Sequence, residues 1–196
     1  MNVPDFMSKS KQQKLSMITC YDAWSAKIIA QTPIDAVLIG DSSAMVMHGF
    51  ESTVPCTVKM IEAHVSAVAR VLKNKLVVAD LPFLSYSKSR EDTFDAVQTL
   101  MQAGAHAVKL EGCADDASMV KAIVQSGVPV MGHLGLTPQA VHQLGGYKVQ
   151  GRQSEAAAQI LKQAEMLEQA GCFSIVLECV PNQLAEEITK TLNVPT

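Results

Sequence analysis

Acidic and imidazole side chains stand at the ends of five apolar segments of the sequence: Asp41, Asp80, Glu111, His133 and Glu178. Each segment is a short run of apolar residues, many of them β-branched, as in strands buried on both faces of a parallel sheet. A charged group in such a strand lowers stability unless it lies at the open end and has a chemical task. Five polar strand ends therefore indicate an active site at the mouth of a β/α barrel.

Asp41 and Asp80 are the candidates for binding a metal ion. Two carboxylates that converge at a barrel mouth repel each other unless a cation lies between them. An oxygen-only site with few protein ligands suits Mg²⁺, which keeps several waters and binds substrate oxygens directly. The alternative is that each aspartate caps the helix that follows its strand, and for either aspartate taken singly this alternative is favoured.

Lys109 and Glu111 lie two residues apart on one strand, so their side chains project to the same side. Such residues are rarely buried inside a barrel without a partner or a ligand. One alternative is an ion pair between the two. A functional role is favoured over it, because a buried ion pair is a poor stabiliser.

Three further side chains have possible roles in a reaction. His133 is a satisfied core group or a member of the site, with the two alternatives evenly balanced. Glu178 is the best candidate for a general base, the alternative being a partner for Lys109. Ser42 directly follows Asp41, and its hydroxyl could bind a substrate carboxylate. The chain has no G-x-S-x-G elbow and no Walker or dinucleotide-binding motif, so serine-hydrolase and nucleotide chemistry are unsupported.

Alternating strands and helices must position these groups. Residues 1–15 are predicted to be a polar, flexible lead-in, and residues 16–196 are predicted to form a single, incomplete β/α barrel domain. The pattern predicts a loop at 41–57 and the opening of a seventh strand at Val194. The strands expected are 16–20, 36–40, 76–79, 107–111, 130–133 and 173–178, and helices are expected at 23–31, 58–73, 89–104, 115–125 and 154–171, with another after the last strand.

Composition excludes several classes of protein. Because 48% of the 196 residues are hydrophobic, the chain can form a core and is not intrinsically disordered. The net charge of −3 and the lack of a basic run argue against nucleic-acid binding, and no apolar run is long enough to span a membrane. The five cysteines, an odd number without a C-x-x-C pair, are expected to be buried reduced thiols.

Several sequence blocks resemble the ketopantoate hydroxymethyltransferase family. The two most specific are Gly132-His-Leu-Gly-Leu-Thr-Pro-Gln139 and Gly145-Gly-Tyr-Lys-Val-Gln-Gly-Arg152. Other matching blocks are Thr19-Cys-Tyr-Asp22, Gly40-Asp-Ser42, Ser52-Thr-Val-Pro-Cys-Thr57, Ala79-Asp-Leu-Pro-Phe83, Gln102-Ala-Gly-Ala-His-Ala-Val-Lys-Leu-Glu-Gly112 and Val176-Leu-Glu-Cys-Val-Pro181. The resemblance implies a (β/α)₈ TIM-barrel fold, of which this chain carries about six βα units and lacks the last two strands.

The resemblance also implies a reaction and a role for each residue. The family transfers a hydroxymethyl group from 5,10-methylenetetrahydrofolate to 3-methyl-2-oxobutanoate with the help of Mg²⁺, giving 2-dehydropantoate. By this resemblance, Asp41 and Asp80 hold the metal and Glu111 supports it through water. Glu178 is the base, and the oxo acid is bound by Ser42, Asp80, Lys109 and His133. A cytoplasmic location and a homodecamer are implied as well.

Two other functions compete with this one. A related Mg²⁺-dependent lyase of the phosphoenolpyruvate mutase and isocitrate lyase type would share the barrel and the metal. Those enzymes generally use a cysteine-bearing loop, and no such motif is recognisable in the sequence. The other competitor is a truncated, non-catalytic homologue that serves only as an assembly partner.

Overall fold

The computed structural model describes residues 1–112 and 116–196, which divide into two compact units at Lys109 and Leu110. The first unit comprises α1 (Val3–Ser10), β1 (Met17–Thr19), α2 (Ala23–Ile29), β2 (Ala36–Ile39), α3 (Ser43–Val46), α4 (Val58–Ala69), β3 (Leu76–Asp80), α5 (Arg90–Gln102) and the start of β4 (Ala107–Glu111). The second comprises the end of β4, α6 (Ser118–Gln125), β5 (Val130–Gly135), η1 (Pro138–Ala140), α7 (Val141–Leu144), α8 (Ser154–Ala170), β6 (Ser174–Glu178) and α9 (Asn182–Thr191). The single domain over 16–196 stays a prediction.

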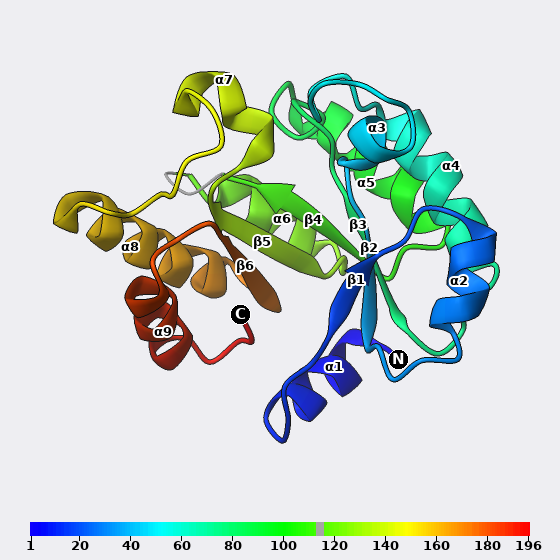
Figure 1. Ribbon diagram of the computed structural model, residues 1–196, viewed down its shortest axis with the longest axis horizontal. Coiled ribbons are helices and arrows are strands. Elements are labelled where there is room, and N and C mark those ends of the chain that lie inside the picture. Colours follow the sequence, from blue (N-terminus) through cyan, green and yellow to red (C-terminus); the bar gives the residue numbers. More distant parts are fainter. Residues whose placement is uncertain (113–115) are drawn as a thin grey trace. The chain divides into compact units, whose positions relative to one another are not determined.

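In the first unit the strands run parallel in the order β1-β2-β3-β4. The residues of β3 are buried throughout, as expected for a parallel strand that is covered on both faces. α4 packs against β2, β3 and α5 (Figure 1). The register aligns Ile39 with Ala79 and Asp80 with Lys109, so that polar residues of neighbouring strands lie side by side at one end of the sheet.

In the second unit β5 pairs with β6 in parallel, and the backbone N–H of Gly112, just after β4, donates to the carbonyl of His133 at 3.2 Å. The register aligns His133 with Val176 and Gly135 with Glu178. Because side chains alternate along a strand, Glu178 projects to the same side of the sheet as Val176. α8 packs on β5, β6 and α9 (Figure 1).

Two predicted helix starts are confirmed by their caps. The Asp22 side chain accepts hydrogen bonds from the backbone N–H groups of Trp24 and Ser25 at the start of α2. The Ser89 hydroxyl accepts one from the backbone of Asp92 at the start of α5. These caps satisfy N–H groups that have no partner within the helix, which fixes where each helix begins.

The N-terminal residues Val3–Ser10 form a helix that the sequence analysis did not predict, whereas the flexible lead-in over residues 1–15 stays a prediction. Asn2 and Asp5 form a capping box, and Phe6 is buried. Lys9 Nζ lies 2.5 Å from Asp35 Oδ1. Burial by itself would raise the pKa of Asp35, but hydrogen bonds from Lys9 and Ser16 outweigh it and lower the pKa below its usual value.

Short helical turns occupy two segments for which no helix was predicted. α3 lies within the loop predicted at 41–57, and η1 with α7 follows β5. Each spans only three or four residues, too few for a helical hydrophobic repeat to be recognised. No strand forms at 194–196, but the Pro195 carbonyl accepts hydrogen bonds from Ile175 N and Ser174 Oγ, so this segment runs alongside β6.

One cysteine differs from expectation. Cys20, Cys56 and Cys172 are buried free thiols, as predicted, whereas Cys179 is exposed. Cys179 directly follows β6, where the chain turns out of the sheet. Cys113 and the predicted helix start at Asp115 lie outside the described residues.

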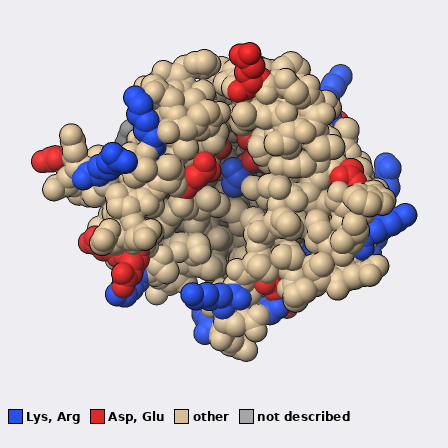
Figure 2. Space-filling model, in the orientation of Figure 1, with Lys and Arg blue, Asp and Glu red and all other residues tan. Residues whose placement is uncertain are grey.

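One face of the described residues can be examined for a nucleic-acid interface. Figure 2 shows acidic and basic side chains scattered over the visible face, without one continuous basic patch. Among the described residues, no helix is both long and apolar enough to cross a lipid bilayer.

An added methyl group at Gly135 is expected to lower the stability of the second unit. Its φ is +89°, and a Cβ there would lie 2.2 Å from the Glu178 carbonyl oxygen. We predict that Gly135→Ala lowers the free energy of unfolding by about 3 kcal/mol or more. Gly127→Ala is the matched control, because Gly127 has φ +93° but open space around its Cβ position, so only about 1 kcal/mol of strain is expected. Urea denaturation measures both, and equal losses would contradict this packing.

Candidate active site

Asp41, Asp80 and Lys109 form a buried charged cluster at the strand ends of the first unit. Lys109 Nζ lies 2.5 Å from Asp80 Oδ1. The backbone N–H of Asp41 donates to Asp80 Oδ2 at 3.1 Å. Only 2% of the Asp80 side chain and 4% of the Lys109 side chain is exposed, and Asp41 is also buried. Asp80 is thus a partner for Lys109 that the sequence analysis had not named.

The charges of this cluster fit a divalent cation with an anionic substrate. Two carboxylates and one ammonium group leave a single excess negative charge in a buried place. A divalent cation together with a monoanionic 2-oxo acid would add a single positive charge and make the cluster neutral, which removes the penalty for burying net charge. The oxygen donors are also of the kind that Mg²⁺ prefers.

The described residues do not form a cage made of protein ligands alone. Over residues 1–112 and 116–196, no three His, Cys, Asp or Glu side chains gather as a metal-binding group. A cation beside Asp41 and Asp80 would therefore complete its coordination with water and substrate oxygens, as Mg²⁺ commonly does.

Ser42 is held beside this cluster by a tyrosine for which the sequence analysis proposed no role. The Ser42 hydroxyl lies 2.8 Å from the Tyr21 hydroxyl, so one donates to the other. Ser42 precedes α3 without capping it through its side chain. His64 Nδ1 lies 2.6 Å from the Tyr21 carbonyl oxygen, and His48 Nε2 lies 3.1 Å from His64 Nε2. The only available signal for Tyr21 was its place in the Thr19-Cys-Tyr-Asp22 block.

Cys56 is a buried thiol near the same carboxylates. Burial is the main reason that its pKa is raised to about 11. A hydrogen bond with Ser43 acts in the opposite direction, and the charges of Asp41 and Asp80 add to the increase. Cys56 is therefore a neutral thiol near pH 7 and is a poor nucleophile or metal ligand there.

A second cluster, Glu111, His133 and Glu178, lies at the strand ends of the second unit. His133 Nδ1 lies 3.3 Å from Glu111 Oε1, and His133 Nε2 lies 3.2 Å from Glu178 Oε2. The imidazole and Glu111 are buried, whereas 42% of the Glu178 side chain is exposed. This arrangement leaves one carboxylate accessible and places its neighbours in fixed positions behind it.

Backbone groups complete this second cluster. Glu111 Oε2 accepts a hydrogen bond from the backbone N–H of the buried Gln139 at 3.0 Å. Gln139 was known beforehand only as the last residue of a matching sequence block. Directly after Glu178, Cys179 has φ +52°, an uncommon value for a residue other than glycine. The strand therefore ends abruptly at Glu178.

The seven predicted site residues thus fall into two clusters, one in each unit. Asp41, Asp80 and Lys109 are in contact, and Ser42 follows Asp41 in the chain. Glu111, His133 and Glu178 form the other cluster. Both ring nitrogens of His133 face carboxylates, which fits a satisfied core group as well as a member of the site, so its place in the site stays a prediction. Metal support by Glu111 stays a prediction.

The sequence matches one protein family along its whole length. Residues 1–196 match the family model for ketopantoate hydroxymethyltransferase. Curated proteins named 3-methyl-2-oxobutanoate hydroxymethyltransferase from Coxiella burnetii (strain CbuK_Q154) and Legionella pneumophila (strain Paris) are 50% and 52% identical over 198 residues. These alignments cover all of this chain, and they cover 74% and 76% of the relatives. The protein of that name from Bdellovibrio bacteriovorus is 55% identical, over 96% of this chain and 72% of its own length.

Solved structures of distant sequence share the fold. A 2,3-dimethylmalate lyase of the PEP mutase/isocitrate lyase superfamily superposes with a TM-score of 0.69 at 16% identity, over 97% of this chain and 66% of its own. A phosphonopyruvate hydrolase, in complex with oxalate and Mg²⁺, gives 0.72 at 11% identity, over 97% and 69%. At these identities the likeness shows the fold alone, and it confirms the predicted α/β architecture of the TIM-barrel type.

The Asp80–Lys109 pair generates a stability prediction. Lys109→Met removes the cation beside a buried carboxylate, so we expect the free energy of unfolding to fall by about 3 kcal/mol or more. The matched control is Lys190→Met, because Lys190 pairs with Glu186 on the surface, with 73% and 66% of their side chains exposed. That exposed pair is worth less than about 0.5 kcal/mol. Chemical denaturation of both variants gives the comparison, and a Lys109→Met protein as stable as the control variant would contradict a buried pair.

Proposed function

Because this chain belongs to the ketopantoate hydroxymethyltransferase family, an enzyme family, we propose that it transfers a hydroxymethyl group from 5,10-methylenetetrahydrofolate to 3-methyl-2-oxobutanoate. The product would be 2-dehydropantoate, in pantothenate biosynthesis. The observation that carries the proposal is the identity of 50–55% with curated enzymes named for this reaction, over nearly the whole chain. The two clusters supply side chains suited to its two chemical tasks, which are binding an oxo acid and removing a proton.

The cluster of the first unit is proposed to bind the oxo acid. Asp41 and Asp80 would hold Mg²⁺, whose Lewis acidity makes the C3 hydrogen of a bound 2-oxo acid easier to remove. Lys109 is fixed by Asp80 and would balance the negative charge of the acid. Ser42 is oriented by Tyr21 and would donate its hydroxyl hydrogen to the substrate carboxylate. The solved hydrolase with oxalate and Mg²⁺ is consistent with this use of the fold.

The cluster of the second unit is proposed to move the proton. Glu178 is the accessible carboxylate, and its Oε2 atom is placed by His133. The C3–H bond of the oxo acid breaks and the proton passes to Glu178. Water adds to the folate-borne methylene carbon, and both bonds from that carbon to folate nitrogens break, with the two protons of water passing to the two nitrogens. The carbon, now at the oxidation level of formaldehyde, would form a bond to C3 of the carbon nucleophile, and its oxygen would take the proton held by Glu178 to become the hydroxyl group of the product. Glu111 holds His133 from the other side and is a positioning residue.

A lyase of the neighbouring superfamily is the competing reaction. The fold is compatible with a lyase as much as with a transferase. The curated relatives cited above, at 50% identity or more, are named for the transferase reaction and so favour the transferase. Incubation with 3-methyl-2-oxobutanoate and methylene-labelled folate separates the two reactions, because a transferase incorporates the label whereas a lyase cleaves a substrate such as 2,3-dimethylmalate.

The cytoplasmic location, the homodecamer and the folate co-substrate are parts of the proposal that rest on the family resemblance. The relatives are enzymes of small-molecule metabolism by their names. Mass measurement in solution tests the assembly separately from the reaction.

The proposed base is tested by isotope exchange. In D₂O with Mg²⁺ and no folate, the wild-type chain should exchange the C3 hydrogen of 3-methyl-2-oxobutanoate for deuterium, as followed by ¹H NMR. Glu178→Gln should slow this exchange by about 100-fold or more while oxo-acid binding, measured by calorimetry, is retained. Glu187→Gln, which alters an exposed carboxylate on α9, is the control. Undiminished exchange in Glu178→Gln would assign the base elsewhere.

A further inference from the structure

His64 on α4 connects segments of the first unit that are far apart in the sequence. Its Nδ1 atom lies 2.6 Å from the carbonyl oxygen of Tyr21, and its Nε2 atom lies 3.1 Å from Nε2 of His48. Tyr21 lies between β1 and α2, whereas His48 follows α3. One imidazole on α4 therefore holds both the start of α2 and the segment that follows α3.

The partners of His64 determine where its hydrogen lies. A carbonyl oxygen can only accept a hydrogen bond, so Nδ1 of His64 carries the hydrogen. In the neutral ring Nε2 is then an acceptor, and His48 donates to it from its own Nε2–H. Both ring nitrogens of His64 are thus engaged, and a flipped ring would lose both hydrogen bonds.

His64 holds Tyr21 at two places. Besides the hydrogen bond to the Tyr21 carbonyl, the two rings pack edge-on, with centroids 5.9 Å apart and an interplanar angle of 68°. Aromatic rings favour this geometry. The backbone before Tyr21 is anchored as well, because the N–H of Cys20 donates to the carbonyl of Leu38 at 3.1 Å. These contacts leave the phenol little freedom, and its hydroxyl lies 2.8 Å from that of Ser42.

The two hydroxyls lie beside the buried charged cluster of the first unit. A Cβ placed on Gly40 would lie 2.8 Å from Ser42 Oγ and 3.5 Å from Asp80 Oδ2. The Tyr21 hydroxyl oxygen would be 3.6 Å from the same point. Three polar atoms therefore surround the position at which Gly40 lacks a side chain. With Tyr21 as donor to Ser42, the Ser42 hydrogen is left to bind a substrate carboxylate.

We propose that His64 is a positioning residue for oxo-acid binding, an inference that rests on the proposed function of Ser42. By holding the carbonyl and the ring of Tyr21, His64 fixes the phenol hydroxyl, which in turn orients the Ser42 hydroxyl toward the substrate carboxylate. A donor that is already oriented loses less conformational entropy when the substrate binds, so the affinity is higher. His64 acts only through Tyr21 and Ser42 and takes no part in removing the proton.

Binding of 3-methyl-2-oxobutanoate in the presence of Mg²⁺, measured by calorimetry, tests this role. His64→Leu removes both hydrogen bonds of the ring, and we expect the affinity to fall by about three- to tenfold. His64→Asn should restore most of it, because the Asn amide nitrogen takes the place of Nδ1 and can donate to the Tyr21 carbonyl. At saturating oxo acid, C3 exchange in D₂O should stay within about twofold of the wild-type rate in both variants, since Glu178 is unchanged.

The dependence on Ser42 separates positioning from a general loss of structure. Ser42→Ala alone should weaken oxo-acid binding. Adding His64→Leu to Ser42→Ala should weaken it no further, because both residues act through the same contact with the substrate. A role of His64 confined to folding would lower the affinity by the same factor in both backgrounds.

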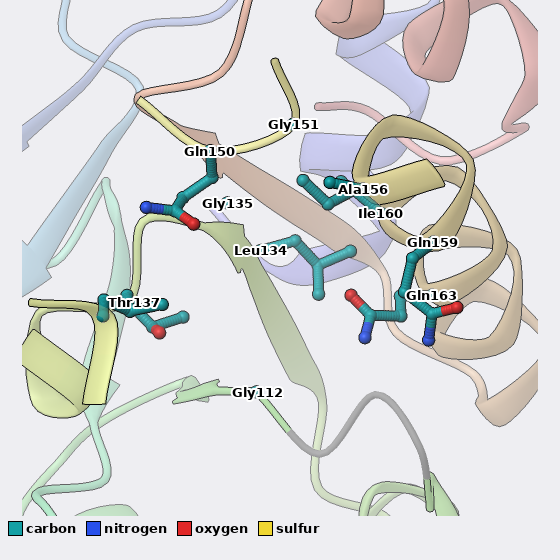
Figure 3. Close-up of a pocket in the computed structure, with 11 residues that line it drawn as sticks. Gly112, Leu134, Gly135, Thr137, Gln150, Gly151, Ala156, Gln159, Ile160 and Gln163 are labelled. Carbon is teal, nitrogen blue, oxygen red and sulfur yellow. The ribbon is translucent and has the colours of Figure 1, made fainter. Parts of the chain in front are cut away.

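Two control variants alter residues outside this series of hydrogen bonds. Lys59→Leu changes an exposed position on α4. Gln163→Leu changes the wall of a pocket of about 370 Å³ in the second unit, between β5 and α8 (Figure 3). Leu134 lines this pocket and projects to the face of β5 opposite His133, because successive side chains of a strand alternate. Neither variant should change the oxo-acid affinity.

Wild-type oxo-acid affinity in His64→Leu would overturn the inference, as would an equal loss of affinity in the Ser42→Ala background. If His64→Leu fails to fold by circular dichroism, His64→Gln takes its place and should show the same loss, because its longer amide reaches toward His48 instead of the Tyr21 carbonyl. A wild-type chain that binds no oxo acid, or a Ser42→Ala variant with wild-type affinity, would instead contradict the proposed function of the first cluster and remove the inference with it.

Discussion

A buried ion pair between neighbouring parallel strands, Asp80 on β3 and Lys109 on β4, determines what the first unit can do. Its two members are in register, so the sheet itself brings them together. Such a pair adds little to stability compared with apolar residues of the same size. Its presence at the buried strand ends, where the neighbouring strand residues are aliphatic, is therefore better explained by chemistry than by folding. With Asp41 beside Asp80, the cluster has one negative charge too many, which a divalent cation and an oxo acid would balance.

The second unit keeps one carboxylate, that of Glu178, accessible to solvent and holds it in place. Glu111 and His133 are buried and stand behind Glu178, which keeps 42% of its side chain exposed. The backbone enforces this arrangement. Gly135 lies too close to the Glu178 carbonyl for any side chain, and Cys179 turns the strand with a positive φ. Strain of this kind persists only where the surrounding packing enforces it, and it is common beside functional groups.

The strand ends could be predicted from sequence because each is an apolar run that ends at or near a charged or imidazole side chain. The caps at Asp22 and Ser89 were likewise local signals. The partner of Lys109 was not predictable in this way, since it depends on the register between β3 and β4, which no single segment encodes. The same holds for the Tyr21 hydroxyl on Ser42, which joins distant segments. α1 was missed because its helical repeat is confined to Val3, Phe6 and Met7 within eight residues, which is too short to stand out in an otherwise polar segment.

The most direct test of the metal-binding role is electron paramagnetic resonance with Mn²⁺ in place of Mg²⁺. With 3-methyl-2-oxobutanoate labelled with ¹⁷O at its keto and carboxylate oxygens, the wild-type chain should show broadened Mn²⁺ lines, because the substrate oxygens bind the ion directly. Asp80→Asn should bind Mn²⁺ much more weakly. An unbroadened spectrum for a chain that binds both ion and acid, or equal Mn²⁺ affinity in Asp80→Asn, would contradict the assignment of this buried cluster as the oxo-acid site.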